Sequence, residues 1–206
     1  MRLIGRLITV VVVSTVFSCP AWAGPIEELS ALQKDLRSVR ADFRQQKRTE
    51  LLPRPIKSKG TFYFRDGSGV RWVYDGQMVV IYDNRTLYLH YTELDEAEKV
   101  NGIAGFSGPL SFNVIELRKD YNIKAEESGE GGIKLVLTPK APMPFETMSM
   151  HFMKSEPFPY EVRVMEETGD VTVIRFVNTD MNVNLKKSLF VFKPKKGVKV
   201  RERNYK

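Results

Sequence analysis

The sequence predicts a mainly β (α+β) fold, in which one curled antiparallel sheet carries an N-terminal helix and a helical lid over an open face. Three observations predict it. An amphipathic segment comes first, short β-branched and aromatic runs separated by turn residues follow, and an apolar, glycine-containing segment without alternation interrupts these runs. The runs add up to about ten or eleven strands, and a sheet of that size is expected to curl.

Residues 1–23 have the features of a secretory signal peptide. Arg2 and Arg6 precede the apolar run Leu7–Phe17, and Ala21-Trp22-Ala23 supplies small residues at the two positions that a signal peptidase reads. The apolar run is shorter than the ~20 residues that span a bilayer. We therefore expect export from the cytoplasm, with cleavage after Ala23.

Cys19, the one cysteine of the chain, leaves a second possibility open. Val16-Phe17-Ser18-Cys19 loosely resembles the box at which a lipoprotein is cleaved and lipidated. A lipid anchor at Cys19 is the less favoured alternative, because bulky Phe17 stands where a small residue is usual. If cleavage falls after Ala23, the processed chain has no disulfide, no thiolate metal site and no thiol nucleophile.

The composition indicates a globular protein with a core. Removal of 23 residues from 206 leaves 183, which suits one domain over residues 24–206. The chain is 42% hydrophobic and 11% aromatic, which is not typical of a disordered protein. The net charge of +7 falls to about +5 without Arg2 and Arg6, which suits solubility, an acidic partner or an anionic membrane surface. Nucleic acid is not expected as a partner, because the basic residues are spread along an exported chain.

Pro25–Arg40 is predicted to form the N-terminal helix, because apolar residues recur there at spacings of three and four. Pro25 suits a first turn, and Glu27 and Glu28 suit the positive end of the helix. The apolar stripe must pack on another apolar surface. It consists of Ile26, Leu29, Leu32, Leu36 and Val39.

β-Branched and aromatic runs then alternate with Asp-Gly or Asp-Asn turns, which is typical of an antiparallel meander. The first predicted strands cover 61–64, 70–74, 78–82 and 87–91. The later ones cover 121–125, 133–137, 147–153, 160–165, 171–177, 189–192 and 197–200. Pro139–Pro144 is expected to be a stiff loop, because proline cannot donate to a strand ladder.

Residues 93–119 lack this alternation. We predict two short helices there, Glu96–Gly105 and Pro109–Arg118, joined by a glycine-rich hinge. The apolar residues of these helices need a surface to cover, and an open sheet face would supply it. The hinge glycines would let such a lid open. They are Gly102, Gly105 and Gly108.

Signals for catalysis are weak. His90 and His151 each stand alone in a strand-like run, and no metalloprotease, nucleophile-elbow or phosphate-loop motif occurs. Glu27-Glu28 and Glu166-Glu167 fall at an expected helix start and a turn, where solvated charge is the expected role. We predict no catalytic residue, no cofactor and no metal site.

Aromatic and methionine side chains occupy alternating strand positions, so each strand places one set on one face. An ordinary packed core explains them, and a concave apolar face that receives a lipid also explains them. Methionine adapts to irregular apolar shapes, and each buried acyl methylene contributes ~0.8 kcal/mol. The predicted lipid contacts on the face and the lid are Phe62, Phe64, Trp72, Tyr74, Ile103, Phe106, Leu110, Phe112, Met148, Met150 and Phe152.

The order and spacing of several short motifs resemble those of the LolA family of periplasmic outer-membrane lipoprotein carriers. Each motif is short, but together they extend over most of the exported chain and keep the family's order. They are Val39–Gln46 with an x-F-x-Q pattern, Lys59–Phe64 with G-x-F-x-F, Arg71–Tyr74 with R-W-x-Y, Asp83–Tyr91, Tyr121–Ile123, Leu137–Lys140 and Phe190–Val198.

The resemblance implies an unclosed antiparallel β-barrel whose concave apolar face is covered by short helices. It implies a periplasmic, monomeric, non-enzymatic carrier. Such a carrier takes acylated lipoproteins from an inner-membrane lipoprotein-releasing exporter and passes them to an outer-membrane acceptor lipoprotein. It also implies an arginine that hydrogen-bonds the lid-helix backbone and controls opening. Arg65 matches that arginine, although Asp66 follows it where the family usually has proline.

Three alternatives stay open. One is an outer-membrane acceptor of the same fold, anchored through a lipidated Cys19. A second is a periplasmic carrier of another lipid. The third is a non-enzymatic sensor or scaffold that binds protein through the meander, and a barrel interior filled by side chains would favour it.

Overall fold

The structure is a computed structural model that describes residues 24–83, 86–101 and 112–204. The predicted signal peptide, with Cys19, lies outside the described residues. So do the predicted hinge glycines and the predicted lid residues Ile103, Phe106 and Leu110.

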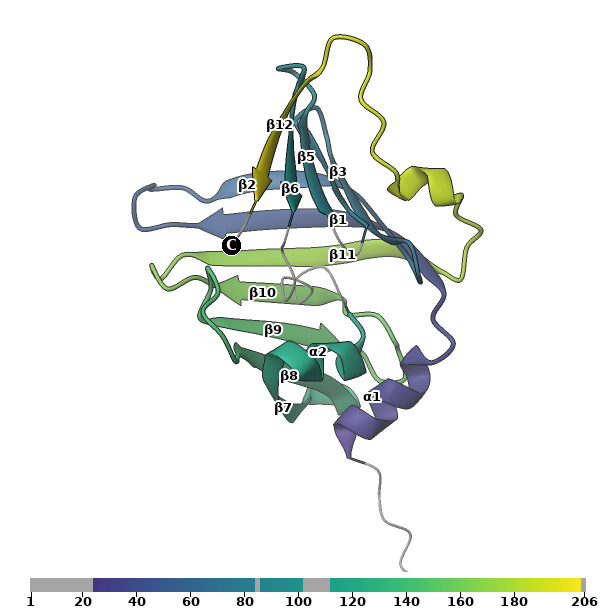
Figure 1. The fold of residues 1–206 in the computed structure, drawn as a ribbon. Coiled ribbons are helices and arrows are strands. Elements are labelled where there is room, and N and C mark those ends of the chain that lie inside the picture. The colour runs from purple at the N-terminus through teal and green to yellow at the C-terminus, as the bar shows by residue number, and fades with distance from the viewer. Residues whose placement is uncertain (1–23, 84–85, 102–111, 205–206) are drawn as a thin grey trace, which may run out of the picture.

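One sheet of twelve strands makes up most of the described chain (Figure 1). The strands are β1 (Ser38–Arg48), β2 (Ile56–Arg65), β3 (Gly69–Tyr74), β4 (Met78–Tyr82), β5 (Thr86–Tyr91), β6 (Glu96–Asn101), β7 (Tyr121–Ser128), β8 (Gly132–Pro139), β9 (Thr147–Phe152), β10 (Glu161–Met165), β11 (Val171–Met181) and β12 (Lys199–Asn204). The helices are α1 (Pro25–Gln33) and α2 (Val114–Asp120), with short 3-10 segments η2 (Gly129–Gly131) and η3 (Lys187–Phe190).

The strands follow the order β12-β6-β5-β4-β3-β2-β1-β11-β10-β9-β8-β7. Within the described chain, the end strands β12 and β7 do not pair with each other, so the sheet is not closed. Each strand is antiparallel to its neighbours except β12, which is parallel to β6. The predicted unclosed, mainly antiparallel barrel is therefore confirmed, with twelve strands where the sequence predicts ten or eleven.

Alternation along β1 shows how the sheet divides its side chains between two faces. Val39, Ala41 and Phe43 are buried, whereas Arg40 and Arg44 between and beyond them are exposed. The buried set points to the concave face, which α1 and α2 cover near β7, β8 and β9 (Figure 1). The opposite face is the convex face.

The N-terminal helix is shorter than the predicted Pro25–Arg40. It begins at Pro25, with the predicted acidic residues in its first turn, but it ends at Gln33. Val39 lies in β1 and pairs with Phe64 on one side and Met181 on the other. The position of Val39 agrees equally well with a helical spacing and with strand alternation. Hydrogen bonding of its segment to two flanking strands makes it part of β1.

The predicted helix Glu96–Gly105 is wrong over its described part, because Glu96–Asn101 forms β6. The backbone of β6 pairs with β5 on one side and with β12 on the other. The local pattern of Glu96–Asn101 does not distinguish a helix from a strand, and hydrogen bonding with the two adjacent strands makes it a strand.

The second predicted helix, Pro109–Arg118, is helical in its described part only from Val114, and it continues to Asp120. Asn113 fixes this start, because its Oδ1 accepts hydrogen bonds from the backbone N–H groups of Ile115 and Glu116 at 2.9 and 3.1 Å. Such a cap satisfies two donors that the first turn leaves without partners.

A strap, residues 182–198, joins β11 to β12 on the convex side, and its predicted strand 189–192 is wrong. The segment Lys187–Phe190 is η3, and Phe190 is buried. Arg71 Nη1 donates to the carbonyl of Leu189 at 3.0 Å, and the ring of Phe192 stacks on Tyr88 with centroids 5.0 Å apart. Side-chain contacts, and not pairing with a strand, attach this segment to the sheet.

Gly60 of β2 lies where β1 and β3 leave no room for a side chain. A methyl group there would overlap the carbonyl of Val73 and touch the ring of Phe43. We expect Gly60→Ala to lower the free energy of unfolding by about 3 kcal/mol, because the strands must move apart. Urea unfolding followed by circular dichroism measures the change.

Gly129→Ala is the matched control. A methyl group at this position meets nothing within 4 Å, so its free energy of unfolding should stay within about 0.5 kcal/mol of the parent value. Equal stability of the two variants would contradict the close strand approach at Gly60.

Candidate functional site

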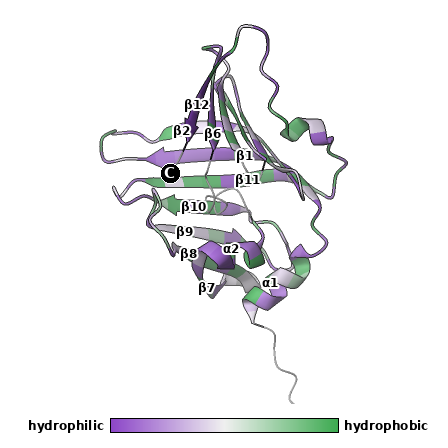
Figure 2. Cartoon of the chain, in the orientation of Figure 1, coloured by the Kyte–Doolittle hydropathy of each residue, from purple (hydrophilic) through white to green (hydrophobic). Residues whose placement is uncertain are grey.

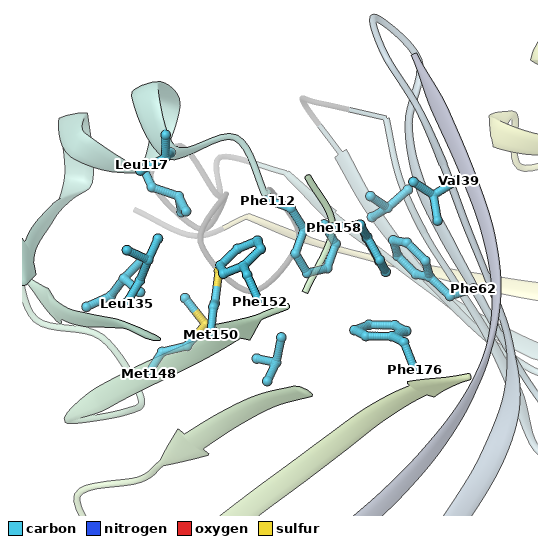
Figure 3. Close-up of a cluster of buried hydrophobic side chains, with 14 of the residues drawn as sticks. Val39, Phe62, Phe112, Leu117, Leu135, Met148, Met150, Phe152, Phe158 and Phe176 are labelled. Carbon is cyan, nitrogen blue, oxygen red and sulfur yellow. The ribbon is translucent and has the colours of Figure 1, made fainter. Parts of the chain in front are cut away.

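The concave face carries one continuous apolar cluster that extends from β1–β3 across β11 to β8 and β9. Figure 3 shows it between Val39 and Phe62 at one end and Leu135 and Met148 at the other. Phe62 is at the centre of an aromatic group, with its ring centroid 4.6 Å from Trp72, 5.5 Å from Phe112 and 5.4 Å from Phe176. Edge and tilted contacts of this kind stabilise beyond the area they bury.

The structure brings together six of the predicted lipid contacts in this cluster, all of them buried. They are Phe62, Trp72, Phe112, Met148, Met150 and Phe152. Phe64 and Tyr74 are partly buried and pack against the cluster. In the structure these residues pack on one another. That they bind a lipid stays a prediction.

The described interior is thus filled by the protein's own side chains. Met148 and Met150 have no exposed area, and Phe152 is 1% exposed. Phe112 comes from the segment before α2 and Phe158 from the β9–β10 connection, and their rings are 4.9 Å apart. A guest on this face must therefore displace residues that now cover it.

Three segments cover the concave face: α1, the segment from Phe112 through α2, and the β9–β10 connection, which together are called the cover. Gln33, at the end of α1, forms hydrogen bonds with the other two segments. Its Nε2 donates to the carbonyls of Phe112 and Pro157 at 2.6 and 3.1 Å, and its Oε1 accepts from the N–H of Val114 at 2.9 Å. The side chain is buried, so these bonds are shielded from water. One amide thereby joins α1, the start of α2 and the β9–β10 connection.

Polar contacts at the surface hold α2 from its other end. Arg118 forms an ion pair with Glu27 of α1 at 3.1 Å, and Lys140 Nζ donates to the carbonyl of Arg118 at 2.7 Å. The ion pair is about half exposed on both sides, so water and salt screen it. The buried amide of Gln33 is therefore the stronger tie.

Arg65 ends β2 beside a pocket of about 360 Å³ between α1, the β2–β3 turn and the start of α2. Gln33 and Leu36 line one wall of this pocket, and Phe112 and Glu116 line another. In the described residues, the guanidinium of Arg65 has no ion pair or side-chain hydrogen bond. This position, next to the start of α2, is compatible with the predicted lid control.

Two polar atoms lie among the apolar side chains of β3. Tyr74 donates its hydroxyl to Gln45 Oε1 at 3.1 Å, and burial raises the pKa of this hydroxyl to about 12. The Nε1 of Trp72 is buried and has no hydrogen-bond acceptor in the described structure. Most buried polar atoms have a partner, so an indole donor without one is an exception.

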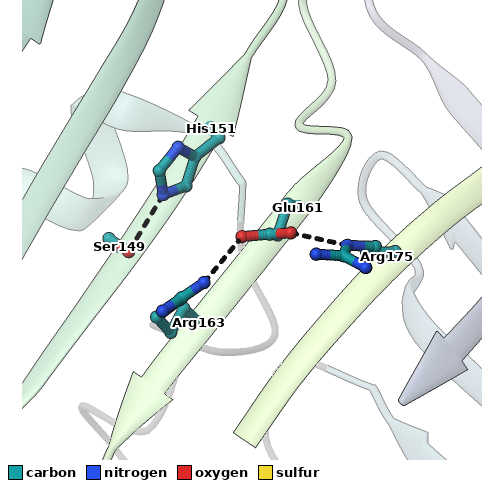
Figure 4. A network of polar contacts seen from close by, with 5 residues as sticks. All are labelled: Ser149, His151, Glu161, Arg163 and Arg175. Atoms are coloured by element: carbon teal, nitrogen blue, oxygen red, sulfur yellow. Dashed lines mark hydrogen bonds and ion pairs between the residues drawn. The ribbon is translucent and has the colours of Figure 1, made fainter. Parts of the chain in front are cut away.

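Ser149, His151 and Glu161 lie close together on the convex face but do not form a catalytic triad (Figure 4). Ser149 Oγ and His151 Nε2 are 3.2 Å apart, whereas the carboxylate of Glu161 is turned to Arg175 at 2.7 Å and Arg163 at 3.4 Å. Burial raises the pKa of Glu161, and the two arginines more than offset this, so that its pKa lies below the ordinary value. Glu161 therefore joins β10 to β11 and does not orient the imidazole.

The described residues contain no group of three or more His, Cys, Asp or Glu side chains that could hold a metal ion. In that same part of the chain, no helix is long and apolar enough to cross a membrane.

Gln33 and Phe158 are two residues of this site that the predicted contacts do not include. Gln33 lies four residues after Leu29, on the apolar stripe of the predicted helix, and a polar residue at such a position signals a buried hydrogen bond. Phe158 stands between prolines in a segment with no periodicity, so no local pattern marks it.

We expect Gln33→Leu to lower the free energy of unfolding by about 2–3 kcal/mol, because it leaves buried carbonyls and the Val114 N–H without partners. Hydrogen exchange should accelerate selectively at the amides of α2. Leu32→Gln, one residue earlier on the helix, is the control for helix propensity. Unchanged exchange at α2 in the Gln33 variant would contradict the role of this amide.

Comparison with known proteins identifies the family. Residues 34–193 match the model of the family described as outer membrane lipoprotein carrier protein LolA. Two similar proteins, both called outer-membrane lipoprotein carrier protein, come from Ralstonia nicotianae and Dechloromonas aromatica. The first is 28% identical, over 89% of this chain and 90% of its own length, and the second is 29% identical, over 87% and 88%.

Among solved structures, an uncharacterized conserved protein from Thermus thermophilus has a similar fold. Its TM-score is 0.54 at 14% identity, over 86% of this chain and 98% of that one. This likeness concerns the fold alone. Because the family model covers well over half of the 206 residues, the chain belongs to the LolA family.

Proposed function

We propose that the protein is a soluble periplasmic carrier that binds the acyl chains of lipoproteins and moves them from the inner to the outer membrane. One observation carries the proposal: a chain of the LolA family has a continuous apolar concave face under a cover of two short helices. The role needs no catalytic group, cofactor or metal. The names of the relatives, which describe carriers of outer-membrane lipoproteins, agree with it.

Acyl chains would bind between the sheet and the cover. Each methylene moved from water into this space contributes ~0.8 kcal/mol. Part of that gain is offset, because Phe112 and Phe158 must leave contacts that they now make with Phe62. Met148 and Met150 suit the floor of such a site, since thioether side chains adapt to guests of irregular shape.

Arg65 would control the opening of the cover. It lines the pocket between β2 and the start of α2, and in the proposed role its guanidinium would donate to backbone carbonyls of the lid. Contacts made only in the covered state shift the equilibrium toward that state and so favour release of cargo.

The proposal includes location and partners. The predicted leader, removed after Ala23, would direct the protein to the periplasm as a monomer. An inner-membrane exporter would supply acylated lipoproteins, and an outer-membrane acceptor lipoprotein would take them.

Three further candidate functions remain. An acceptor anchored through Cys19 differs from a free carrier at its first residue, so mass spectrometry of the exported N-terminus separates lipidated Cys19 from Gly24. A sensor or scaffold is favoured by the side-chain-filled interior, and a carrier of another lipid would bind that lipid in preference to lipoprotein.

Trp72 supplies a direct test of where acyl chains lie. In a chain that begins at Gly24 it is the sole tryptophan, because Trp22 belongs to the predicted leader. We expect a triacylated lipoprotein with brominated acyl chains to form a soluble complex without detergent and to quench the emission of Trp72. The same lipoprotein without bromine should bind without quenching.

The outcomes of this test are distinct. If no soluble complex forms, the carrier proposal fails. If a complex forms and Trp72 keeps its emission, acyl chains bind away from the concave face, and the site is wrong although carriage stands.

Arg65→Leu should slow the dissociation of bound lipoprotein by about tenfold, since loss of the proposed hydrogen bond from a charged group would weaken the covered state by ~1.5 kcal/mol. Transfer of radiolabelled lipoprotein to acceptor-containing vesicles measures this rate. Lys195→Leu, on the strap, is the control for loss of a cation. An unchanged dissociation rate in the Arg65 variant would show that Arg65 does not control opening of the lid.

A further inference from the structure

The β1–β2 hairpin, residues 44–59, extends past the neighbouring strands and ends in an apolar tip (Figure 1). Leu51 is 91% exposed, which is the largest value among the exposed large hydrophobic side chains of the described chain. Leu52 and Ile56 beside it are 46% and 50% exposed. Grouped apolar side chains in water are unfavourable and mark surfaces that contact something else.

Basic residues surround this tip. The hairpin contains six cations, Arg44, Lys47, Arg48, Arg54, Lys57 and Lys59, against the single anion Glu50, which leaves +5. Residues 24–206 also have a net charge of about +5, so the part of the chain outside the hairpin has a net charge near zero. The strongly hydrophilic colour of β1 in Figure 2 marks one arm of the hairpin.

The strand register places Arg44, Arg48, Lys57 and Lys59 together on the convex face. Arg44 pairs with Lys59 and Gln46 with Lys57, and Arg48 follows two residues further on β1. Lys59 is 3.7 Å from Asp75, but Arg44, Arg48, Arg54 and Lys57 have no ion pair in the part of the chain that the structure describes. Neighbouring like charges repel, and an anionic surface relieves that repulsion.

Lys47 has a different role on the opposite face of the hairpin. Its Nζ is 2.6 Å from Glu166 and 3.4 Å from Asp170, both near the β10–β11 turn. This double ion pair joins the outer end of the β1–β2 ladder, where Lys47 pairs with Ile56, to the β10–β11 turn.

We propose that this hairpin docks on bilayers that contain anionic phospholipid, with Leu51 and Leu52 in the interfacial region and the flanking cations against headgroup phosphates. An amphipathic element with apolar residues between basic ones fits this surface. Two leucines and four free cations give reversible contact, because stable anchoring needs a longer apolar group. The contact does not depend on acyl-chain binding, so it goes beyond carriage.

Sedimentation with large unilamellar vesicles tests the proposal, using exported protein freed of acyl cargo. We expect binding to phosphatidylcholine vesicles that contain phosphatidylglycerol, and little binding to phosphatidylcholine alone. Leu51→Ser with Leu52→Ser, and separately Arg48→Ser with Arg54→Ser and Lys57→Ser, should each weaken binding about tenfold. Raised salt should weaken the charge-dependent part.

Two matched controls locate the effect. Leu94→Ser removes a leucine that is 68% exposed on another turn. Lys193→Ser with Lys195→Ser and Lys196→Ser removes three exposed cations from the strap. Both controls should bind as the parent does. Equal losses in the control and hairpin triple variants would mean that overall charge acts, and would overturn the proposal.

Absence of binding by the parent protein to anionic vesicles would also overturn it, and would leave an acidic protein surface as the partner. Leu51→Trp gives an independent readout, because Trp72 is buried. Emission from the new indole should shift to shorter wavelength only with anionic vesicles. No shift would exclude insertion of the tip. None of these assays contains lipoprotein, so their failure is separate from failure of carriage.

Discussion

The rest of the structure depends on one constraint: the concave face of an unclosed sheet is apolar and cannot be left in water. Burial of apolar area contributes roughly 25 cal/mol per Å², and this cluster spans strands from β1 to β11. A closed barrel would bury such a face by itself. Here β7 and β12 stay apart, so separate elements must cover it, and the positions of α1, α2 and the β9–β10 connection follow from that need.

How the cover is attached matters as much as its presence. Gln33 makes three hydrogen bonds to backbone atoms of two other segments, whereas the outer tie from Arg118 to Glu27 is exposed. Apolar contacts beneath the cover are non-directional, so they can be exchanged for contacts with a guest at small net cost. In the proposed carrier, side chains that pack on one another in this way would favour release of a guest after binding.

The sequence predicts the meander well, because alternation and Asp-Gly turns are local signals, as at β3 and β4. It fails where local pattern is ambiguous. Val39 becomes a strand residue because β11, far away in sequence, pairs with it, and Glu96–Asn101 becomes a strand between the adjacent β5 and the distant β12. The floor of the site, such as Met148 and Phe62, follows from alternation, but Gln33 and Phe158 act through tertiary contacts that no short window contains.

The place of β1 in the sheet has a consequence for how the chain acquires this structure. β1 pairs with β11, so Phe43 meets Phe176 across more than half of the sequence. Contacts of such long range close slowly, because loop entropy is lost before they form. Until β11 has emerged, the first strand keeps an open edge and an uncovered apolar face. We therefore expect the complete sheet to form only after β11 has been synthesised, and an incompletely folded chain is the form that can be threaded through a membrane pore.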